Sequence, residues 1–260
     1  LTVLDRPELT TPAASTHPPL IRRALAGGAW AHVDATVVGE QLVARLGAEP
    51  ERVVRVPLAP SPLPEGDPTA VAELVGRGRF VLALGTIEPR KGLPGLVRAF
   101  DSMAGDDGLD DVRLVLAGPP GWGVDELDRA VAASEHRDRI VRIGWVDAST
   151  RSALLRSAAV LAYPSLDEGF GLPPLEAMSV DTPVVASDAG ALPETLGDAA
   201  LITPTGDHAA LARALSRVLS EPDTARRLVE AGRERVGSYS WRATVEGLVA
   251  LYRRAVRTSG

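Results

Sequence analysis

The sequence lacks cysteine, long apolar runs and an excess of basic charge. Without cysteine the chain forms no disulfide and offers no thiolate to a metal, which fits a reducing, cytoplasmic setting. No run reaches the roughly 18–20 apolar residues of a membrane-spanning helix, so only a peripheral contact with the inner face of a membrane stays open. The net charge of −6 argues against a nucleic-acid partner, which requires a basic surface.

Metal-binding patterns are also missing. The paired acids at 106–107 and 110–111 precede a predicted strand, whereas a metal motif at a strand end would follow it. The four histidines are scattered without ligand spacing: His17, His32, His136 and His208. We therefore expect no metal site and no cofactor.

What the sequence does contain is an alternation of short apolar runs with helical segments. Apolar residues make up 45% of the 260 positions, enough for one large or two modest domains. The predicted strands lie at residues 80–85, 112–117, 140–143, 158–163, 182–187 and 200–202. Helices between them imply an α/β fold with a Rossmann-like parallel sheet, which binds ligands beyond the carboxyl ends of its strands.

A proline-rich stretch at residues 57–68 predicts a stiff linker without regular structure. Before it, residues 1–19 are predicted to be irregular and 19–32 helical, with strands at 35–38 and 52–56 around a short helix. This fragment is too small to close its own sheet. We expect three parts: residues 1–60, 61–240 and a C-terminal helix in 241–260.

Two acids flank a predicted strand-loop-helix junction. Glu168 lies in the loop and Glu176 in the helix, whose first turn suits Pro173 and Pro174. Gly169 and Gly171 allow close approach of the backbone to a ligand, and the unpaired amides of the helix start favour an anion or an electron-rich oxygen. The sequence therefore predicts a ligand-binding loop here.

Each acid also has a structural explanation. Glu176 would complement the helix start, an effect of about 0.3–1 kcal/mol, and Glu168 would simply be solvated. Alternatively, both carboxylates accept hydrogen bonds from the vicinal hydroxyls of a sugar or ribose, each contributing roughly 1.5–3 kcal/mol. The residues alone leave the two explanations open.

The segment Glu168-Gly-Phe-Gly-Leu-Pro-Pro-Leu-Glu176-Ala-Met resembles the Glu-x7-Glu signature of the retaining, nucleotide-sugar-dependent glycosyltransferases of family 4, which have the GT-B fold. The resemblance implies that Glu176 holds the ribose hydroxyls. It also implies that the donor sugar is contacted by Glu168 and the loop residues Gly169, Phe170, Gly171 and Leu172.

The same resemblance implies a domain organisation. Residues 1–60 would be the last part of an N-terminal, acceptor-binding Rossmann-like domain, whose earlier part would precede Leu1. Residues 61–240 would be the nucleotide-sugar-binding domain. The helix in residues 241–260 would pack back on the N-terminal domain, although a merely packed surface helix is the alternative.

A second loop, Gly85-Thr-Ile-Glu-Pro-Arg-Lys-Gly92, carries a basic pair after the first strand of the sheet. As an isolated pair, Arg90 and Lys91 would be solvated charges. At a strand's carboxyl end they instead suit phosphate oxygens. The resemblance implies that the pair grips the donor diphosphate beside Gly85 and Thr86, where many relatives carry a further basic residue in place of Thr86.

Two further loops are predicted to line the pocket. Gly118 follows the second strand, and Gly144-Trp-Val-Asp follows the third. In relatives the backbone at the position of Val146 touches the base, whereas Trp145 is equally suited to stacking on a ring and to packing. Glu194 is interpreted as supporting a helix start.

Together these features predict retaining transfer of mannose or another hexose from GDP-mannose or a UDP-hexose to a glycan or lipid-linked acceptor. Arg90 and Lys91 would stabilise charge on the leaving diphosphate and Glu168 would position the sugar, which makes these three the catalytic candidates. Two alternatives stay open: a GT-B-fold sugar-nucleotide epimerase and a donor-binding module without turnover.

Overall fold

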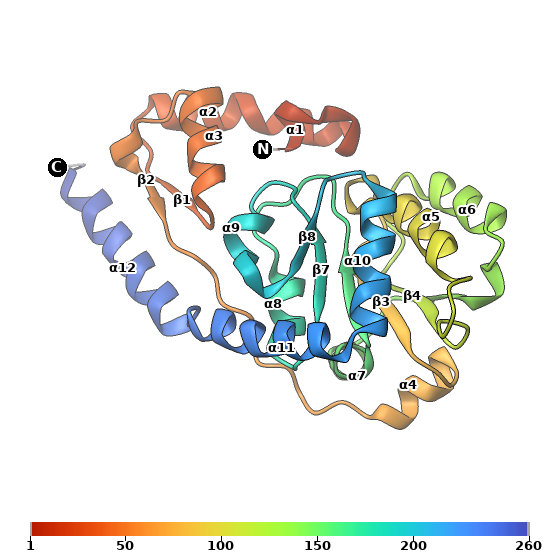
Figure 1. Ribbon diagram of the computed structural model, residues 1–260. Helices are drawn as coiled ribbons and strands as arrows, with labels where there is room; N and C mark the ends of the chain where they lie inside the picture. Colours follow the sequence, from red (N-terminus) through yellow and green to blue (C-terminus); the bar gives the residue numbers. More distant parts are fainter. Residues whose placement is uncertain (1, 259–260) are drawn as a thin grey trace.

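A six-stranded sheet forms the centre of the computed structural model, which describes residues 2–258 (Figure 1). Every neighbouring pair of strands is parallel. The strands are β3 (Phe80–Leu84), β4 (Arg113–Ala117), β5 (Ile140–Gly144), β6 (Val160–Tyr163), β7 (Val184–Ser187) and β8 (Leu201–Thr203). The predicted α/β class with a Rossmann-like sheet is confirmed.

The order of the strands reverses in the middle of the sheet. The order is β5-β4-β3-β6-β7-β8, so the chain builds outward from β3, returns to the centre at β6 and then builds outward on the other side. Ligands of open α/β sheets bind at such a reversal, outside the carboxyl ends of the two central strands. The loops that follow β3 and β6 are those predicted to carry the site.

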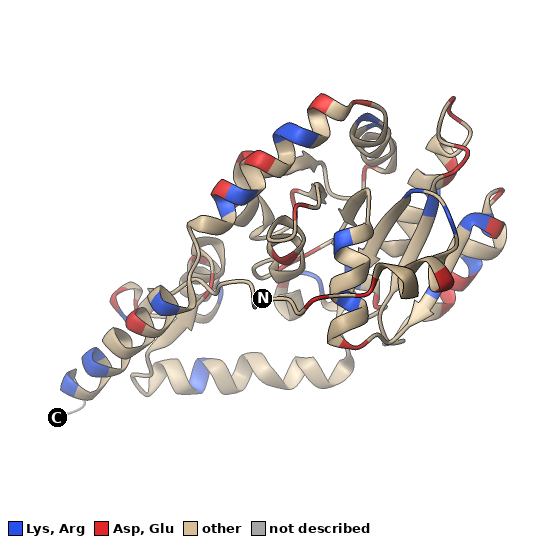
Figure 2. Cartoon of the chain, turned by 90° about the horizontal axis from the view of Figure 1, so that it is seen from below, with Lys and Arg blue, Asp and Glu red and all other residues tan. Residues whose placement is uncertain are grey.

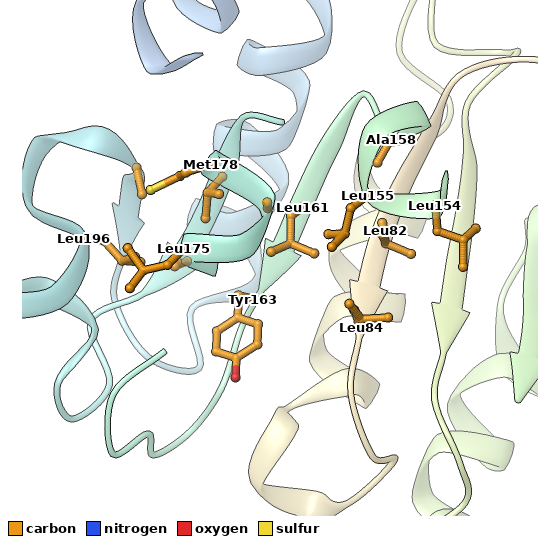
Figure 3. Packing of buried hydrophobic residues seen from close by; sticks show 14 of the residues in the cluster. Leu82, Leu84, Leu154, Leu155, Ala158, Leu161, Tyr163, Leu175, Met178 and Leu196 are labelled. Carbon is orange, nitrogen blue, oxygen red and sulfur yellow. The ribbon is translucent and has the colours of Figure 1, made fainter. Parts of the chain in front are cut away.

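Side chains of each strand alternate between two buried layers. On β3, Leu82 and Leu84 join one apolar cluster, whereas Val81 and Ala83 join the other. Figure 3 shows the first cluster, in which Leu82 and Leu161 lie on neighbouring strands. The first face is covered by α4 (Pro68–Val75), α7 (Ala148–Ser157), α8 (Leu172–Met178) and α9 (Leu192–Leu196), and the second by α5 (Leu93–Met103), α6 (Val124–Ala133) and α10 (His208–Ser220).

The N-terminal part surrounds a two-stranded parallel sheet. Its elements are α1 (Thr2–Asp5), α2 (His17–Ala26), β1 (Ala31–Val33), α3 (Thr36–Leu46) and β2 (Val53–Arg55), with 3-10 turns at Pro7–Leu9, Pro12–Thr16 and Pro50–Arg52. The expectation that residues 1–19 are irregular is therefore wrong for much of the segment, where prolines occupy the first turns of short helices. Leu1 lies outside the described residues.

The strand predicted at residues 35–38 is also wrong, because α3 begins at Thr36. Val37 and Val38 favour a strand locally. In the fold, however, the carboxylate of Glu194 in α9 accepts the backbone N–H groups of Thr36 at 2.9 Å and Val37 at 3.4 Å. Glu194 does support a helix start, but that of α3 rather than its own. A capping group so distant in sequence gives no local signal.

The proline-rich linker ends one residue earlier than expected. Residues 56–67 contain no helix or strand, but α4 begins at Pro68. Asp67 caps this helix by accepting the N–H of Thr69 at 2.8 Å, and proline suits the first helical position. The sequence analysis does not predict this helix, because a proline next to a proline-rich stretch looks like part of the linker although it suits the first turn of a helix.

The chain ends in two helices, α11 (Pro222–Gly237) and α12 (Trp241–Thr258), and α12 runs beside the N-terminal part (Figure 1). The Thr244 hydroxyl donates to the carbonyl of Pro57 at 2.7 Å, and Gly247 lies against Val56. The division at residues 60 and 240 stays a prediction.

Between residues 2 and 258 no helix combines the length and apolarity needed to cross a bilayer. Figure 2 shows acidic and basic residues interspersed along the chain.

Candidate functional site

Two loops meet at the carboxyl ends of β3 and β6. After β3 the chain forms a 3-10 turn at Pro89–Lys91, and Gly92 then takes a left-handed conformation (φ 63°) at the start of α5. The backbone N–H of Leu166 in the loop after β6 donates to the carbonyl of Arg90 at 2.7 Å. This bond fixes the basic pair against the acidic loop.

The basic pair and Glu168 form one cluster. Four donors lie within 3.3 Å of the Glu168 Oε2 atom: Tyr163 OH at 2.8 Å, Lys91 Nζ at 2.9 Å, Arg90 Nη1 at 3.1 Å and Ser165 Oγ at 3.3 Å. All three predicted catalytic residues are thus brought together. They touch one another directly, rather than facing each other across an open crevice.

Burial and the neighbouring charges shift the pKa of each charged side chain in the cluster. Burial alone would raise the pKa of Glu168, but the charges of Lys91 and Arg90 outweigh it, so the pKa lies below its ordinary value. For Arg90, the carboxylates of Glu168 and Glu88 overcome the effect of burial and raise the pKa. Burial, aided by the charge of Arg90, lowers the pKa of Lys91 against the opposing pull of Glu168.

The two basic side chains differ in what they have left to offer a ligand. The Nε and Nη2 atoms of Arg90 donate to the carboxylate of Glu88 at 3.1 and 2.6 Å. Its Nη1 atom donates to the carboxylate of Glu168 and to the backbone carbonyl of Asp167, each at 3.1 Å. Four of its five N–H groups therefore have protein acceptors. Lys91 gives one hydrogen to Glu168 and one to Tyr163, at 2.9 and 2.7 Å, which leaves its third for a ligand.

Glu176 lies apart from this cluster. It is buried in α8 with 5% of its surface exposed, and its carboxylate accepts a hydrogen bond from Arg151 of α7. Its predicted contact with ribose stays a prediction. Arg151 was missed by the sequence analysis, since only the packing of α7 beside α8 brings it to Glu176.

The glycines near the cluster have different reasons for being glycine. A Cβ atom on Gly118 would lie 1.9 Å from the carbonyl oxygen of Gly85, so Gly118 is required where the loops after β3 and β4 approach each other. A Cβ atom on Gly85 would lie 3.6 Å from Cε of Lys91. Gly85 therefore borders the cluster directly, whereas packing explains the buried Gly118. Their predicted contacts with substrate are untested.

The acidic loop itself is partly open. Gly169 is exposed with free space around it, and Gly171, in a left-handed conformation (φ 105°), precedes Leu172 at the start of α8. The Phe170 ring points into the core, edge-on to Tyr239 with ring centroids 5.8 Å apart. Only the backbone of Phe170 is thus available to a ligand.

The remaining predicted residues lie at the edges of the site. Thr86 is exposed, and Val146 is half-buried against the first apolar cluster. Trp145 is 71% exposed, so the packing alternative for its side chain is wrong, and stacking on a ring stays a prediction. Within residues 2–258 no three or more His, Cys, Asp or Glu side chains gather in a way that could hold a metal ion.

The sheet is doubly wound, and its acidic and basic loops meet where the strand order reverses, which defines an α/β protein of the class that binds ligands at this edge. The family described as "Glycosyl transferases group 1" matches residues 70–235, and the chain belongs to this family. Its fold is GT-B.

Named relatives support this assignment. The chain is 38% identical over 189 residues to phosphatidyl-myo-inositol mannosyltransferase of Mycobacterium leprae. The alignment covers 70% of this chain and 48% of the relative. It is 35% identical over 163 residues to O-antigen chain mannosyltransferase B of Escherichia coli. That alignment covers 62% of this chain and 42% of the relative. The chain thus spans less than half the length of these two relatives.

Solved structures show the same fold. Sucrose-phosphate synthase from Thermosynechococcus elongatus aligns with a TM-score of 0.81 and 26% identity, over 96% of this chain and 65% of that protein. Anabaena HepE in complex with UDP and glucose aligns with a TM-score of 0.74 and 18% identity, over 93% of this chain and 67% of that protein. The second likeness concerns the fold alone.

Proposed function

We propose that the chain binds a nucleoside-diphosphate sugar beyond the ends of β3 and β6 and forms the donor half of a retaining glycosyltransferase. The observation that carries the proposal is the cluster of Arg90, Lys91 and Glu168. It sets two cations and a carboxylate where the strand order reverses. A diphosphate requires the cations, and sugar hydroxyls require an acceptor.

Lys91 is the group best suited to the leaving diphosphate. In the transfer, the bond between the anomeric carbon and the diphosphate oxygen breaks, and a bond to the acceptor oxygen forms. The acceptor hydroxyl's proton passes to the departing diphosphate. Negative charge grows on the diphosphate as the bond breaks, and the free third hydrogen of Lys91 would meet it without a metal ion or another cofactor. Arg90 would chiefly hold the two loops together.

Glu168 would position the donor sugar rather than attack it. Its Oε2 atom is surrounded by four donors, which makes it a poor nucleophile. Oε1 takes none of these four bonds and would accept a sugar hydroxyl. Attack by the acceptor on the face from which the diphosphate leaves would then give retention, as the family resemblance implies.

Glu176 would hold the ribose of the donor. Its carboxylate pairs with Arg151, and a ligand hydroxyl would have to share or replace that partner. Gly85, Thr86, Gly118, Val146 and the loop from Gly169 to Leu172 would complete the donor pocket. The expected donor is GDP-mannose or a UDP-hexose, and the names of the relatives suggest mannose.

The acceptor is proposed to be a glycan or a lipid-linked saccharide, because two relatives are named for O-antigen chains and a phosphatidylinositol. An acceptor of this kind fits a cytoplasmic enzyme that touches the inner face of a membrane. The N-terminal part would contribute to the acceptor side, together with any sequence that precedes Leu1.

The test is a titration with GDP, UDP and their hexose conjugates, followed by measurement of nucleotide release. The proposal predicts release that depends on added acceptor, and a greater loss of turnover than of donor binding in Lys91→Ala. Interconversion of the sugar nucleotide without acceptor would indicate an epimerase instead. Tight donor binding without release under any condition would indicate a binding module.

A further inference from the structure

Tyr163 is a buried hydroxyl that the proposed transfer does not use. It ends β6 with 3% of its surface exposed, and its side chain points out of the core toward the ends of the strands (Figure 3). Its OH lies 2.7 Å from Lys91 Nζ and 2.8 Å from Glu168 Oε2, which are themselves 2.9 Å apart. The three atoms form a closed triangle of hydrogen bonds.

A phenol is suited to this corner of the triangle because it both donates and accepts. It gives its single hydrogen to the carboxylate and accepts one from the ammonium. Burial, reinforced by the Glu168 charge, raises the pKa of Tyr163 well above its usual range, so the hydroxyl keeps its hydrogen. A phenylalanine ring would fill the same space but could make neither bond.

Lys91 is the side chain that needs such fixing. It is the only lysine among the 28 Lys and Arg residues of the sequence. Its ammonium is a point charge on a flexible four-carbon stem, unlike the planar fork of arginine. The Nζ atom also lies 4.6 Å from the centre of the Tyr163 ring, so one tyrosine holds the charge through both its ring and its hydroxyl.

We propose that Tyr163 is a positioning residue: it fixes Lys91 and Glu168 relative to each other, so that the third ammonium hydrogen points at the terminal phosphate of the donor diphosphate. The inference rests on the proposed function and deepens it. Tyr163 acts through Lys91 and need not touch the substrate.

The affinities for a nucleoside monophosphate and the matching diphosphate provide the test, using GMP with GDP and UMP with UDP. The ratio of the two dissociation constants isolates the terminal phosphate, and the diphosphate carries the charge that the leaving group develops. Calorimetry of Tyr163→Phe should show that the ratio of the monophosphate to the diphosphate dissociation constant falls about tenfold, while the affinity for the monophosphate is unchanged. This is the loss expected when the hydrogen bond from Lys91 to the terminal phosphate is weakened. A general disturbance of the fold would weaken both ligands equally.

Two controls make the result specific. Tyr239→Phe removes a hydroxyl that donates to the carbonyl of Thr195 at 3.0 Å, and it should leave the ratio unchanged. In a Lys91→Met background, Tyr163→Phe should change the ratio no further, because the residue through which it acts is gone. Thermal unfolding of each variant checks that the fold is retained.

The outcomes separate the two claims. If wild type prefers the diphosphate and Tyr163→Phe keeps that preference, the positioning role is overturned and the proposed function stands. If the effects of Tyr163→Phe and Lys91→Met are simply additive, the positioning role is likewise overturned. If wild type binds none of the four nucleotides, the proposed function fails and this inference fails with it.

Discussion

The carboxylate of Glu194 accepts the backbone N–H of Thr36 at 2.9 Å, across 158 positions of sequence. The same carboxylate accepts from the Thr36 hydroxyl at 2.9 Å and pairs with Arg55 of β2 at 2.8 Å. Glu194 belongs to the six-stranded part, whereas Thr36 and Arg55 belong to the two-stranded part. One side chain thus caps α3 and links the two sheets on either side of the proline-rich linker.

We predict that Glu194→Ala lowers the free energy of unfolding by about 0.5–2 kcal/mol, because the first N–H groups of α3 lose the carboxylate that caps them. Denaturant unfolding measures the change. Glu194→Gln keeps one acceptor oxygen and should lose less. Equal stability of wild type and the alanine variant would show that the link contributes nothing.

Lys91→Arg should behave as a severe change rather than a conservative one. A planar guanidinium cannot direct single hydrogens at Tyr163, Glu168 and a phosphate from one nitrogen, so we expect at least a tenfold loss of diphosphate affinity, or about 1.4 kcal/mol. Arg226→Lys, in an exposed ion pair on α11, is the matched control and should be silent. Calorimetry with GDP and UDP measures the diphosphate affinity of each variant. Wild-type affinity in Lys91→Arg would refute the requirement for an ammonium.

Acid should remove the contribution of Glu168 to stability. Its folded pKa lies below the ordinary value of 4.5, so that contribution is complete above this pH and is lost as the pH falls through the folded pKa. The difference in unfolding free energy between wild type and Glu168→Gln should therefore shrink below pH 4.5. Asp223→Asn, at an exposed carboxylate, serves as the control. A difference that stays constant with pH would contradict the ionised cluster.

Glu176→Ala should weaken nucleotide binding for monophosphates and diphosphates alike, because ribose is common to both. A charged hydrogen bond lost at a buried site corresponds to about 1.5–3 kcal/mol. Arg151→Ala should instead destabilise the fold by about 1–3 kcal/mol, since it leaves Glu176 buried without its partner. Calorimetry and thermal unfolding of both variants test the two roles. An effect of Glu176→Ala on diphosphates alone would move Glu176 away from the ribose.

The sequence predicted the six-stranded part well because its signals are local. Each strand is a short apolar run, and Asp147 and Asp207 start their helices by accepting N–H groups from residues three positions away, at 2.7 and 2.8 Å. The loops after β3 and β6 were correctly placed at one edge because parallel strands end on the same side of a sheet.

The rest depended on contacts between distant residues. The start of α3 is fixed by Glu194, and no pattern near Val37 reveals it. The sequence places Tyr163 in a buried strand, yet its hydroxyl accepts a hydrogen bond from a lysine 72 positions away. The partner of Glu176 on α7 likewise followed only from packing. Local periodicity predicts elements, whereas the side chains that organise a site belong to the assembled fold.

The single lysine allows the central claim to be tested at one atom. Protein grown with isotope-labelled lysine should give one ε-methylene signal, that of Lys91, in the nuclear magnetic resonance spectrum. Titration with the diphosphate that binds in calorimetry should shift this signal strongly, and the matching monophosphate should shift it far less. A Lys91 signal that stays in place while the diphosphate saturates the protein would contradict the account.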